Sequence, residues 1–181
     1  MFDSLAPRIL IGLGSNVRGP WGDPLETIEE TLRRFPQYGL TVTARSSVVS
    51  SAPYGVVDQP IFANAVAAIS TSLPPAALLY RLHAIEADAG RRRGQRWGPR
   101  TLDLDLLAYG PLTTAAPARE SWRRGRRHPL TLPHPEMAWR PFVLEPLAEI
   151  APFWHHPVTG LTASQMSRRR YAQAAAGGQV L

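Results

Sequence analysis

The alternation of hydrophobic and polar residues over positions 8–109 predicts four β-strands and two α-helices. A short apolar run at 8–14, a segment rich in Thr and Val at 40–49 and an alternating segment at 62–71 each favour a strand. Residues 102–109 alternate apolar with acidic residues before a glycine and predict the fourth strand. Within 62–71, the pleat is expected to place Asn64 and Val66 on one face and Ala65 and Ala67 on the other.

Two segments carry helix start and stop signals. The first, at 24–35, begins with Asp-Pro-Leu-Glu, which supplies an N-cap, a proline in the first turn and a capping-box glutamate, and Pro36 ends it. Its apolar residues at helical spacing are Leu25, Ile28, Leu32 and Phe35. The second, at 75–89, opens at a Pro-Pro pair and ends at Gly90, with an apolar stripe of Leu78, Leu82, Ile85 and Ala89.

The order of these elements, β-α-β-β-α-β, is the split arrangement of ferredoxin-like folds. We therefore predict an α+β fold with a ferredoxin-like core, a long loop insertion at 111–131 and a C-terminal helical extension. A chain of 181 residues is expected to form a single domain over 1–181, because one core usually spans roughly 100–200 residues. The sequence defines the tail at 153–181 only poorly.

Composition narrows the classes of function. The chain has no cysteine, which excludes a thiolate zinc site, an iron–sulfur cluster and a cysteine nucleophile. All 20 basic residues are arginine, and with 14 acidic residues they give a net charge of +6 that favours anionic partners. Without a signal peptide pattern or an apolar run of membrane-spanning length, we expect a cytoplasmic chain with no membrane partner. The histidines at 83, 155 and 156 are expected at the surface.

The candidate chemistry centres on residues 96–105, Arg-Trp-Gly-Pro-Arg-Thr-Leu-Asp-Leu-Asp. Residues two apart on a strand share a face, so Asp103 and Asp105 present two carboxylates side by side. A divalent cation would relieve their repulsion, and oxygen ligands alone favour magnesium. An isolated Asp-x-Asp pair can equally be two solvent-facing acids balanced by arginines. Five arginines within 91–100 favour the first interpretation, since a polyphosphate site needs metal-binding carboxylates beside guanidinium groups.

A lysine-containing phosphate loop is excluded, because the Gly-Leu-Gly-Ser-Asn segment at 12–16 is too short and lacks lysine. Taken alone, that segment is equally well explained as an ordinary bend between a strand and a loop.

These motifs together resemble the 6-hydroxymethyl-7,8-dihydropterin pyrophosphokinase family of folate biosynthesis. The resemblance runs in order over about 9–152 and rests on 14–16, 51–55, 58–60, Phe62, 64–65, 85–86, 90–91, 96–105, 132–135, Arg140 and Phe142. It implies a magnesium-dependent enzyme that transfers pyrophosphate from ATP to the pterin alcohol and releases AMP. The implied partners are these two small molecules, without nucleic acid, and the chain is expected to be a monomer.

The resemblance also implies a role for individual residues. Asp103 and Asp105 would hold two magnesium ions, while Arg91 and Arg100 would clamp the phosphates. The residues implied to contact ATP are Glu86, Arg93, Trp97, Thr131, His134 and Arg140. Phe62 and Phe142 would sandwich the pterin and Asn64 would read its amide edge, which agrees with the needs of a flat ring with donors and acceptors. The remaining rim contacts would come from Ser51, Ala52, Tyr54 and Gly55.

Two alternatives differ in class from this enzyme. A basic RNA-binding module would use the same order of elements, but its sheet should carry aromatic and basic residues where this chain has two acids. A family member that binds its ligands without turnover is disfavoured by the intact Arg91, Arg100, Asp103, Asp105 and Asn64.

Overall fold

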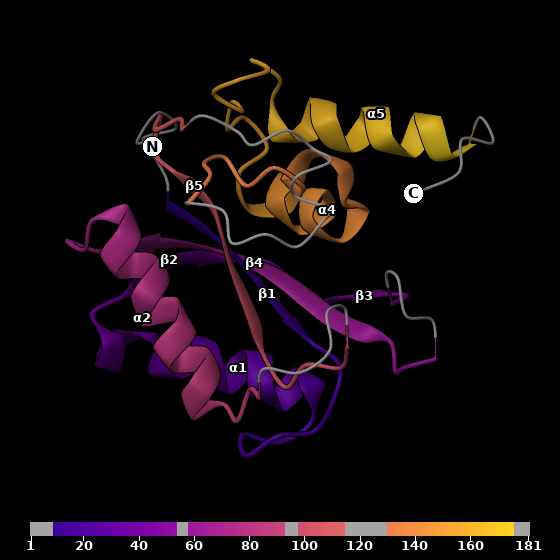
Figure 1. Cartoon of the computed structure of the whole chain (residues 1–181). Helices are drawn as coiled ribbons and strands as arrows, with labels where there is room; N and C mark the ends of the chain where they lie inside the picture. Colours follow the sequence, from indigo (N-terminus) through magenta and orange to yellow (C-terminus); the bar gives the residue numbers. More distant parts are fainter. Residues whose placement is uncertain (1–8, 54–57, 93–97, 115–129, 176–181) are drawn as a thin grey trace.

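The computed structural model describes residues 9–53, 58–92, 98–114 and 130–175 as an α+β fold around an antiparallel sheet of five strands (Figure 1). The strands are β1 (Ile9–Ser15), β2 (Thr41–Arg45), β3 (Val49–Ser51), β4 (Phe62–Ser70) and β5 (Asp103–Tyr109). Their order across the sheet is β2-β4-β1-β5, and the short β3 also pairs with β4. The strands predicted at 8–14, 62–71 and 102–109 are therefore confirmed to within a residue or two.

Helices cover both faces of the sheet, as Figure 1 shows: α1 (Pro24–Arg34) and α2 (Pro75–Asp88) lie on one side, and α4 (Pro141–Ile150) with α5 (Ala163–Ala175) lies on the other. The first side buries the larger core, which contains Ile11 of β1, Ala67 of β4 and Leu104 of β5. The second side buries a smaller core around Leu10 and Leu147. Among the described residues, this smaller core covers only part of its face, and a pocket lies over the rest.

The two predicted helices form where their capping signals stand. Asp23 caps α1 in a reciprocal capping box with Glu26, and Pro24 occupies the first turn. The expected stripe of α2 is fully buried. Gly90 follows α2 with φ of +81° and lies so close to Pro20 that any side chain there would clash. Of the four apolar residues at helical spacing, Leu25 is 54% exposed and the other three are buried.

The prediction of one strand over 40–49 is wrong. The structure has two strands there, because the chain leaves the ladder with β4 after Arg45 and returns to it at Val49. Ser46 explains the break. Its buried side chain accepts the Val66 amide hydrogen at 3.0 Å, so a hydroxyl replaces the backbone carbonyl that a continuous strand would offer. Glu149 of α4 then accepts the Ser47 amide hydrogen at 2.9 Å and joins this break to the helix layer.

The expected C-terminal helical extension is present as α5, which lies against α4 (Figure 1). A short 3₁₀ helix, η2 (Met137–Trp139), precedes α4, and the hydroxyl of Tyr171 in α5 donates to Glu145 of α4 at 2.7 Å. His156 is only 7% exposed, which corrects its expected surface position: burial lowers its pKa, and its Nδ1 accepts amide hydrogens of the following turn. Among the helices of the described residues, none is both long and apolar enough to cross a bilayer.

Candidate active site

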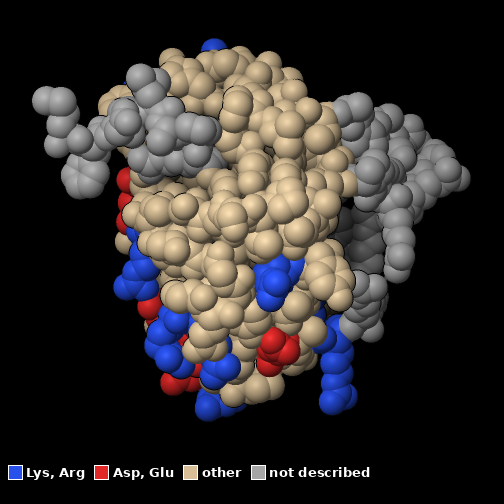
Figure 2. Space-filling model, turned by 90° about the vertical axis from the view of Figure 1, so that its left-hand side faces the viewer, with Lys and Arg blue, Asp and Glu red and all other residues tan. Residues whose placement is uncertain are grey.

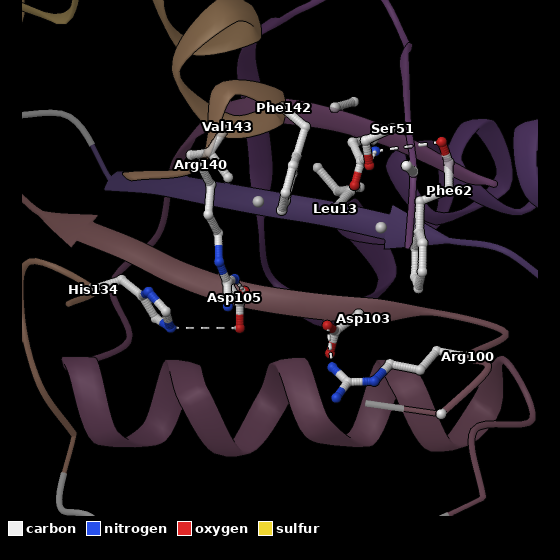
Figure 3. Close-up of a pocket in the computed structure, with 16 residues that line it drawn as sticks. Leu13, Ser51, Phe62, Arg100, Asp103, Asp105, His134, Arg140, Phe142 and Val143 are labelled. Carbon is white, nitrogen blue, oxygen red and sulfur yellow. Dashed lines mark hydrogen bonds and ion pairs between the residues drawn. The ribbon is translucent and has the colours of Figure 1, made fainter. Parts of the chain in front are cut away.

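A pocket of about 230 Å³ opens on the uncovered part of the face that carries α4 (Figure 3). Strands β1, β4 and β5 form its floor, and residues at the start of α4 and in the 98–100 segment form its walls. Sixteen residues line it: Gly12, Leu13, Gly14, Ser51, Ala52, Phe62, Asn64, Ala65, Gly98, Arg100, Asp103, Asp105, His134, Arg140, Phe142 and Val143. Ten of them belong to the site expected from the sequence.

The floor of the pocket is made by glycines of β1. Gly14 pairs with Asn64 on β4 and with Asp103 on β5, so these three residues lie in one row across the sheet. In the next row on the same face, Gly12 pairs with Asp105. A Cβ on Gly14 would lie 3.5 Å from Asn64 Oδ1 and 3.8 Å from Asp103 Cβ, which shows that the absent side chain leaves the space between amide and carboxylate open.

One end of the pocket carries both carboxylates and their positive partners. Asp103 accepts from Arg91 at 2.7 Å and forms a second ion pair with Arg100, and its side chain is 23% exposed. Asp105 lies 3.4 Å from a guanidinium nitrogen of Arg140 and 3.9 Å from Nε2 of His134. Figure 3 shows both carboxylates next to β5, with Arg140 reaching toward Asp105 and Arg100 toward Asp103. The expected shared face of this pair is confirmed.

The charges around Asp105 keep it ionised. Burial acts to raise the pKa of Asp105, but the protonated form of His134, together with Arg140 and Arg100, outweighs burial and lowers that pKa below its usual value. Burial lowers the pKa of His134 despite the neighbouring Asp105 carboxylate. Nδ1 of His134 accepts the Glu136 amide hydrogen at 3.2 Å, so the neutral ring carries its proton on Nε2, toward Asp105.

Glu86 lies behind the pocket and does not line it. Its side chain is 5% exposed, accepts the Leu104 amide hydrogen at 2.8 Å and pairs with Arg91. Burial raises the pKa of Glu86 to about 7, although Arg91 opposes the shift. Arg91 therefore bridges Glu86 and Asp103, and Glu86 also holds the Leu104 amide between the two carboxylates of β5.

The other end of the pocket is aromatic and polar. Phe62 begins β4 and Phe142 belongs to the first turn of α4, and both rings project into the pocket (Figure 3). Asn64 is 5% exposed and donates from Nδ2 to the Ser51 hydroxyl at 3.0 Å. Since Ser51 belongs to β3, this bond turns the Nδ2 of Asn64 toward β3 and its Oδ1 toward Gly14 and the pocket floor. Such an end suits a flat heterocycle with an amide edge.

Not every expected site residue lies in the pocket. Thr131 and Glu86 are buried outside it, and Arg91 reaches it through Asp103. Four lie outside the described residues: Tyr54, Gly55, Arg93 and Trp97. The lining residues that the sequence interpretation missed are Gly12, Leu13, Gly14, Ala65, Gly98 and Val143. The glycines at 12 and 14 gave a usable signal, because two glycines spaced by two on one strand leave one face of that strand bare.

The donor set fits magnesium better than a softer metal. Asp103 and Asp105 offer hard oxygen atoms, and no group of three His, Asp or Glu side chains gathers as a metal cage within the described ranges. Mg²⁺ commonly binds through one or two carboxylates and takes its remaining ligands from water and phosphate oxygens. The pair is therefore compatible with Mg²⁺ bound together with a polyphosphate.

Comparison with known proteins agrees with this geometry. A model of the family described as 7,8-dihydro-6-hydroxymethylpterin-pyrophosphokinase (HPPK) matches residues 10–152. A 2-amino-4-hydroxy-6-hydroxymethyldihydropteridine pyrophosphokinase of Synechocystis is 42% identical over 157 residues, which are 87% of this chain and 73% of that protein. The enzyme of the same name from Pseudomonas aeruginosa is 42% identical over 146 residues, 80% of this chain and 81% of that one.

Solved structures resemble the fold more distantly. The HPPK-DHPS chain of Plasmodium falciparum, solved with pteroate, matches 94% of this chain with a TM-score of 0.68 and 13% identity. This chain spans 43% of that longer one. At such low identity the likeness concerns the fold alone.

Proposed function

The chain belongs to the 7,8-dihydro-6-hydroxymethylpterin-pyrophosphokinase family and is thus a pyrophosphokinase of folate biosynthesis, and we propose that its donor is ATP, used with Mg²⁺. The acceptor is the hydroxymethyl group of 6-hydroxymethyl-7,8-dihydropterin. Its oxygen forms a bond to the β-phosphorus of ATP, the bond from that phosphorus to the α,β-bridging oxygen breaks, and AMP leaves. The hydroxyl proton is released, and the product is the pterin pyrophosphate.

The single observation that carries this proposal is the two-ended pocket. Phe62, Phe142 and Asn64 line the end suited to a heterocycle, while Asp103 and Asp105 with their arginines line the end suited to phosphates. Gly14 separates Asn64 from Asp103 without a side chain, so a hydroxymethyl group on a ring at one end can face a phosphate at the other. Catalysis by proximity needs this alignment.

In the pterin half, Phe62 and Phe142 hold the two faces of the ring and Asn64 Oδ1 accepts from its amide edge. The orientation of Asn64 is supported by the bond from its Nδ2 to Ser51. The backbone groups of Ser51 and Ala52 complete the rim, and the family resemblance adds Tyr54 and Gly55.

In the phosphate half, Arg100 and Arg91 bind the transferred group, and Arg140 and His134 contact the nucleotide phosphates. His134 acts as a neutral donor through Nε2–H, since its Nδ1 already accepts from Glu136. Asp103 and Asp105 would hold Mg²⁺, which when bound supplies charge neutralisation on the phosphates and acidifies a coordinated hydroxyl. Thr131, Arg93 and Trp97 are assigned to ATP by resemblance, and Glu86 acts through Arg91.

We further assign the core as ferredoxin-like within one domain over 1–181, in a monomeric, cytoplasmic protein. Two features support the fold assignment. The spatial strand order is β2-β4-β1-β5, and along the chain α1 connects β1 to β2 and α2 connects β4 to β5. The RNA-binding alternative lacks support. The free part of the sheet carries acidic residues, and on the face in Figure 2 acidic and basic side chains lie intermixed.

Product analysis tests the proposal. Purified protein with ATP, the reduced hydroxymethyl pterin and Mg²⁺ should release one AMP per pterin pyrophosphate, and chelation of Mg²⁺ should stop the reaction. Release of ADP in place of AMP, or unchanged turnover in the presence of a chelator, would overturn it.

A further inference from the structure

Asn16, which follows β1, has no role in the pocket as described above, yet it is 1% exposed and its side chain is fully hydrogen-bonded. Its Nδ2 donates to Gln59 Oε1 at 3.0 Å and to the Pro60 carbonyl at 3.1 Å. Its Oδ1 accepts the Arg100 amide hydrogen at 2.8 Å, and its own amide donates to the Arg100 carbonyl at 3.1 Å. One side chain thus joins segments more than forty residues away on both sides of the pocket.

Each of the two segments leads directly to one end of the pocket. The 58–60 segment precedes Phe62, one of the two aromatic walls of the pterin half. Arg100 lines the phosphate half and pairs with Asp103. The hydroxyl of Ser15 donates to the Thr101 carbonyl at 2.6 Å, which holds the phosphate-side segment to β1 a second time. On the pterin side, the β1–β4 ladder ends at the pair Ser15–Ala63, so the 58–60 segment lies just beyond it and is held to the end of β1 by Asn16.

We infer that Asn16 is a positioning residue that couples the two substrate halves by holding the 58–60 segment and Arg100 at a fixed separation. The inference rests on the proposed function, because it presumes that one half binds the pterin and the other the phosphates. When a substrate fixes the residues of its own half of the pocket, the hydrogen bonds of the Asn16 amide also restrain the residues of the other half. A substrate pair should therefore bind more tightly together than separately.

The donor and acceptor groups of the Asn16 amide bind opposite sides of the pocket, so a substitution can remove one set of bonds and keep the other. Asparagine offers two N–H donors and one carbonyl acceptor, and here the donors serve the pterin side while the acceptor serves the phosphate side. Asn16→Asp retains the acceptor for the Arg100 amide and removes both donors. Gln59→Leu removes the Oε1 acceptor on the pterin side without altering Asn16 or Arg100. Gln37→Leu, at an exposed glutamine of the 3₁₀ helix η1 (Phe35–Tyr38), is the matched control.

The experiment measures coupling by calorimetry. The dissociation constant of the pterin is determined with and without a non-hydrolysable ATP analogue plus Mg²⁺, and kcat is measured on the same preparations. Asn16→Asp and Gln59→Leu should reduce the coupling ratio and kcat at least about tenfold, and should change the affinity for each ligand alone less than about threefold. The double variant should lose no more coupling than Asn16→Asp alone, because Asn16→Asp already breaks the bond to Gln59 that Gln59→Leu removes.

A merely structural role predicts a different pattern. If Asn16→Asp lowers the melting temperature but leaves coupling and kcat at the levels of Gln37→Leu, the inference is wrong. Additive losses in the double variant would also overturn it. Should Asn16→Asp fail to fold, Gln59→Leu decides on the same criteria, because Gln59 is only partly buried. A wild-type protein that yields no AMP would refute the proposed function instead, and that outcome is read from a separate assay.

Discussion

Asp103→Asn tests whether the carboxylate pair is a catalytic site or only a structural one. The substitution keeps the shape of the side chain and removes the charge that pairs with Arg91 and Arg100. In the absence of ligands, both guanidinium groups then lose their partner carboxylate at this position. Because Glu86 still pairs with Arg91, the larger loss falls on Arg100.

The expected stability change follows from the exposure of these groups. The side chains of Arg91, Arg100 and Asp103 are 24%, 27% and 23% exposed, so the pairs are neither surface pairs nor fully buried ones. Exposed pairs contribute about 0–1 kcal/mol, and removal of one partner from a buried pair costs about 3–5 kcal/mol. Relief of the repulsion between Asp103 and Asp105 offsets part of the loss. We expect the ligand-free variant to lose about 1–3 kcal/mol of unfolding free energy.

The effect on catalysis should be larger. A metal that stabilises charge in the transition state contributes several kcal/mol, so loss of a ligand should reduce kcat/KM at least about 100-fold. Urea unfolding and steady-state AMP release on the same preparation measure both quantities. Asp88→Asn, which removes an exposed carboxylate bonded to the Tyr38 hydroxyl, is the control and should keep full activity.

Each result has a distinct meaning for this reasoning. A destabilised Asp103→Asn protein with normal turnover would make the carboxylate structural only. A variant with wild-type stability would show that the ion pairs with Arg91 and Arg100 contribute nothing to the folded state.

Three further changes probe other parts of the account. Asn64→Ala should weaken pterin binding about 10–100-fold in calorimetry, because loss of the Oδ1 acceptor leaves a buried donor of the pterin unpaired, at a cost of about 1–3 kcal/mol. Unchanged affinity would remove Asn64 from the site. Burial raises the pKa of Glu86 from 4.5 to about 7, so the folded state favours its protonated form. The unfolding free energy of wild type should therefore fall by roughly 3 kcal/mol relative to that of Glu86→Gln as the pH rises from about 4.5 to 7. A difference between the two unfolding free energies, measured with urea, that stays constant across this range would contradict the pKa shift. Asp23→Ala should cost about 1 kcal/mol of unfolding free energy by loss of the α1 cap, without any change in the KM for pterin or ATP.

Local signals in the sequence were sufficient for the elements that local physics controls. The capping residues at 23–26 begin α1, and the stripe of α2 is buried as its spacing predicts. The shared face of Asp103 and Asp105 follows from strand geometry alone. These features depend on neighbours along the chain, so a single sequence contains the information.

Features that depend on pairing between distant segments could not be predicted in the same way. The bare floor at Gly12 and Gly14 needs the registers with β4 and β5, which place Asn64 and the carboxylates on either side. The break after Arg45 depends on the Ser46 side chain reaching Val66. Likewise, the bridge from Glu86 through Arg91 to Asp103 forms only because the end of α2 lies beside β5.

The central claim is that one pocket aligns a pterin and a triphosphate on opposite sides of Gly14. Crystallography of the protein with Mg²⁺, a non-hydrolysable ATP analogue and the hydroxymethyl pterin tests it most directly. The account predicts the ring between Phe62 and Phe142, metal density on Asp103 and Asp105, and the hydroxymethyl oxygen facing the β-phosphorus. Carboxylates that bind no metal in the ternary complex, or a pterin located outside the two rings, would contradict it.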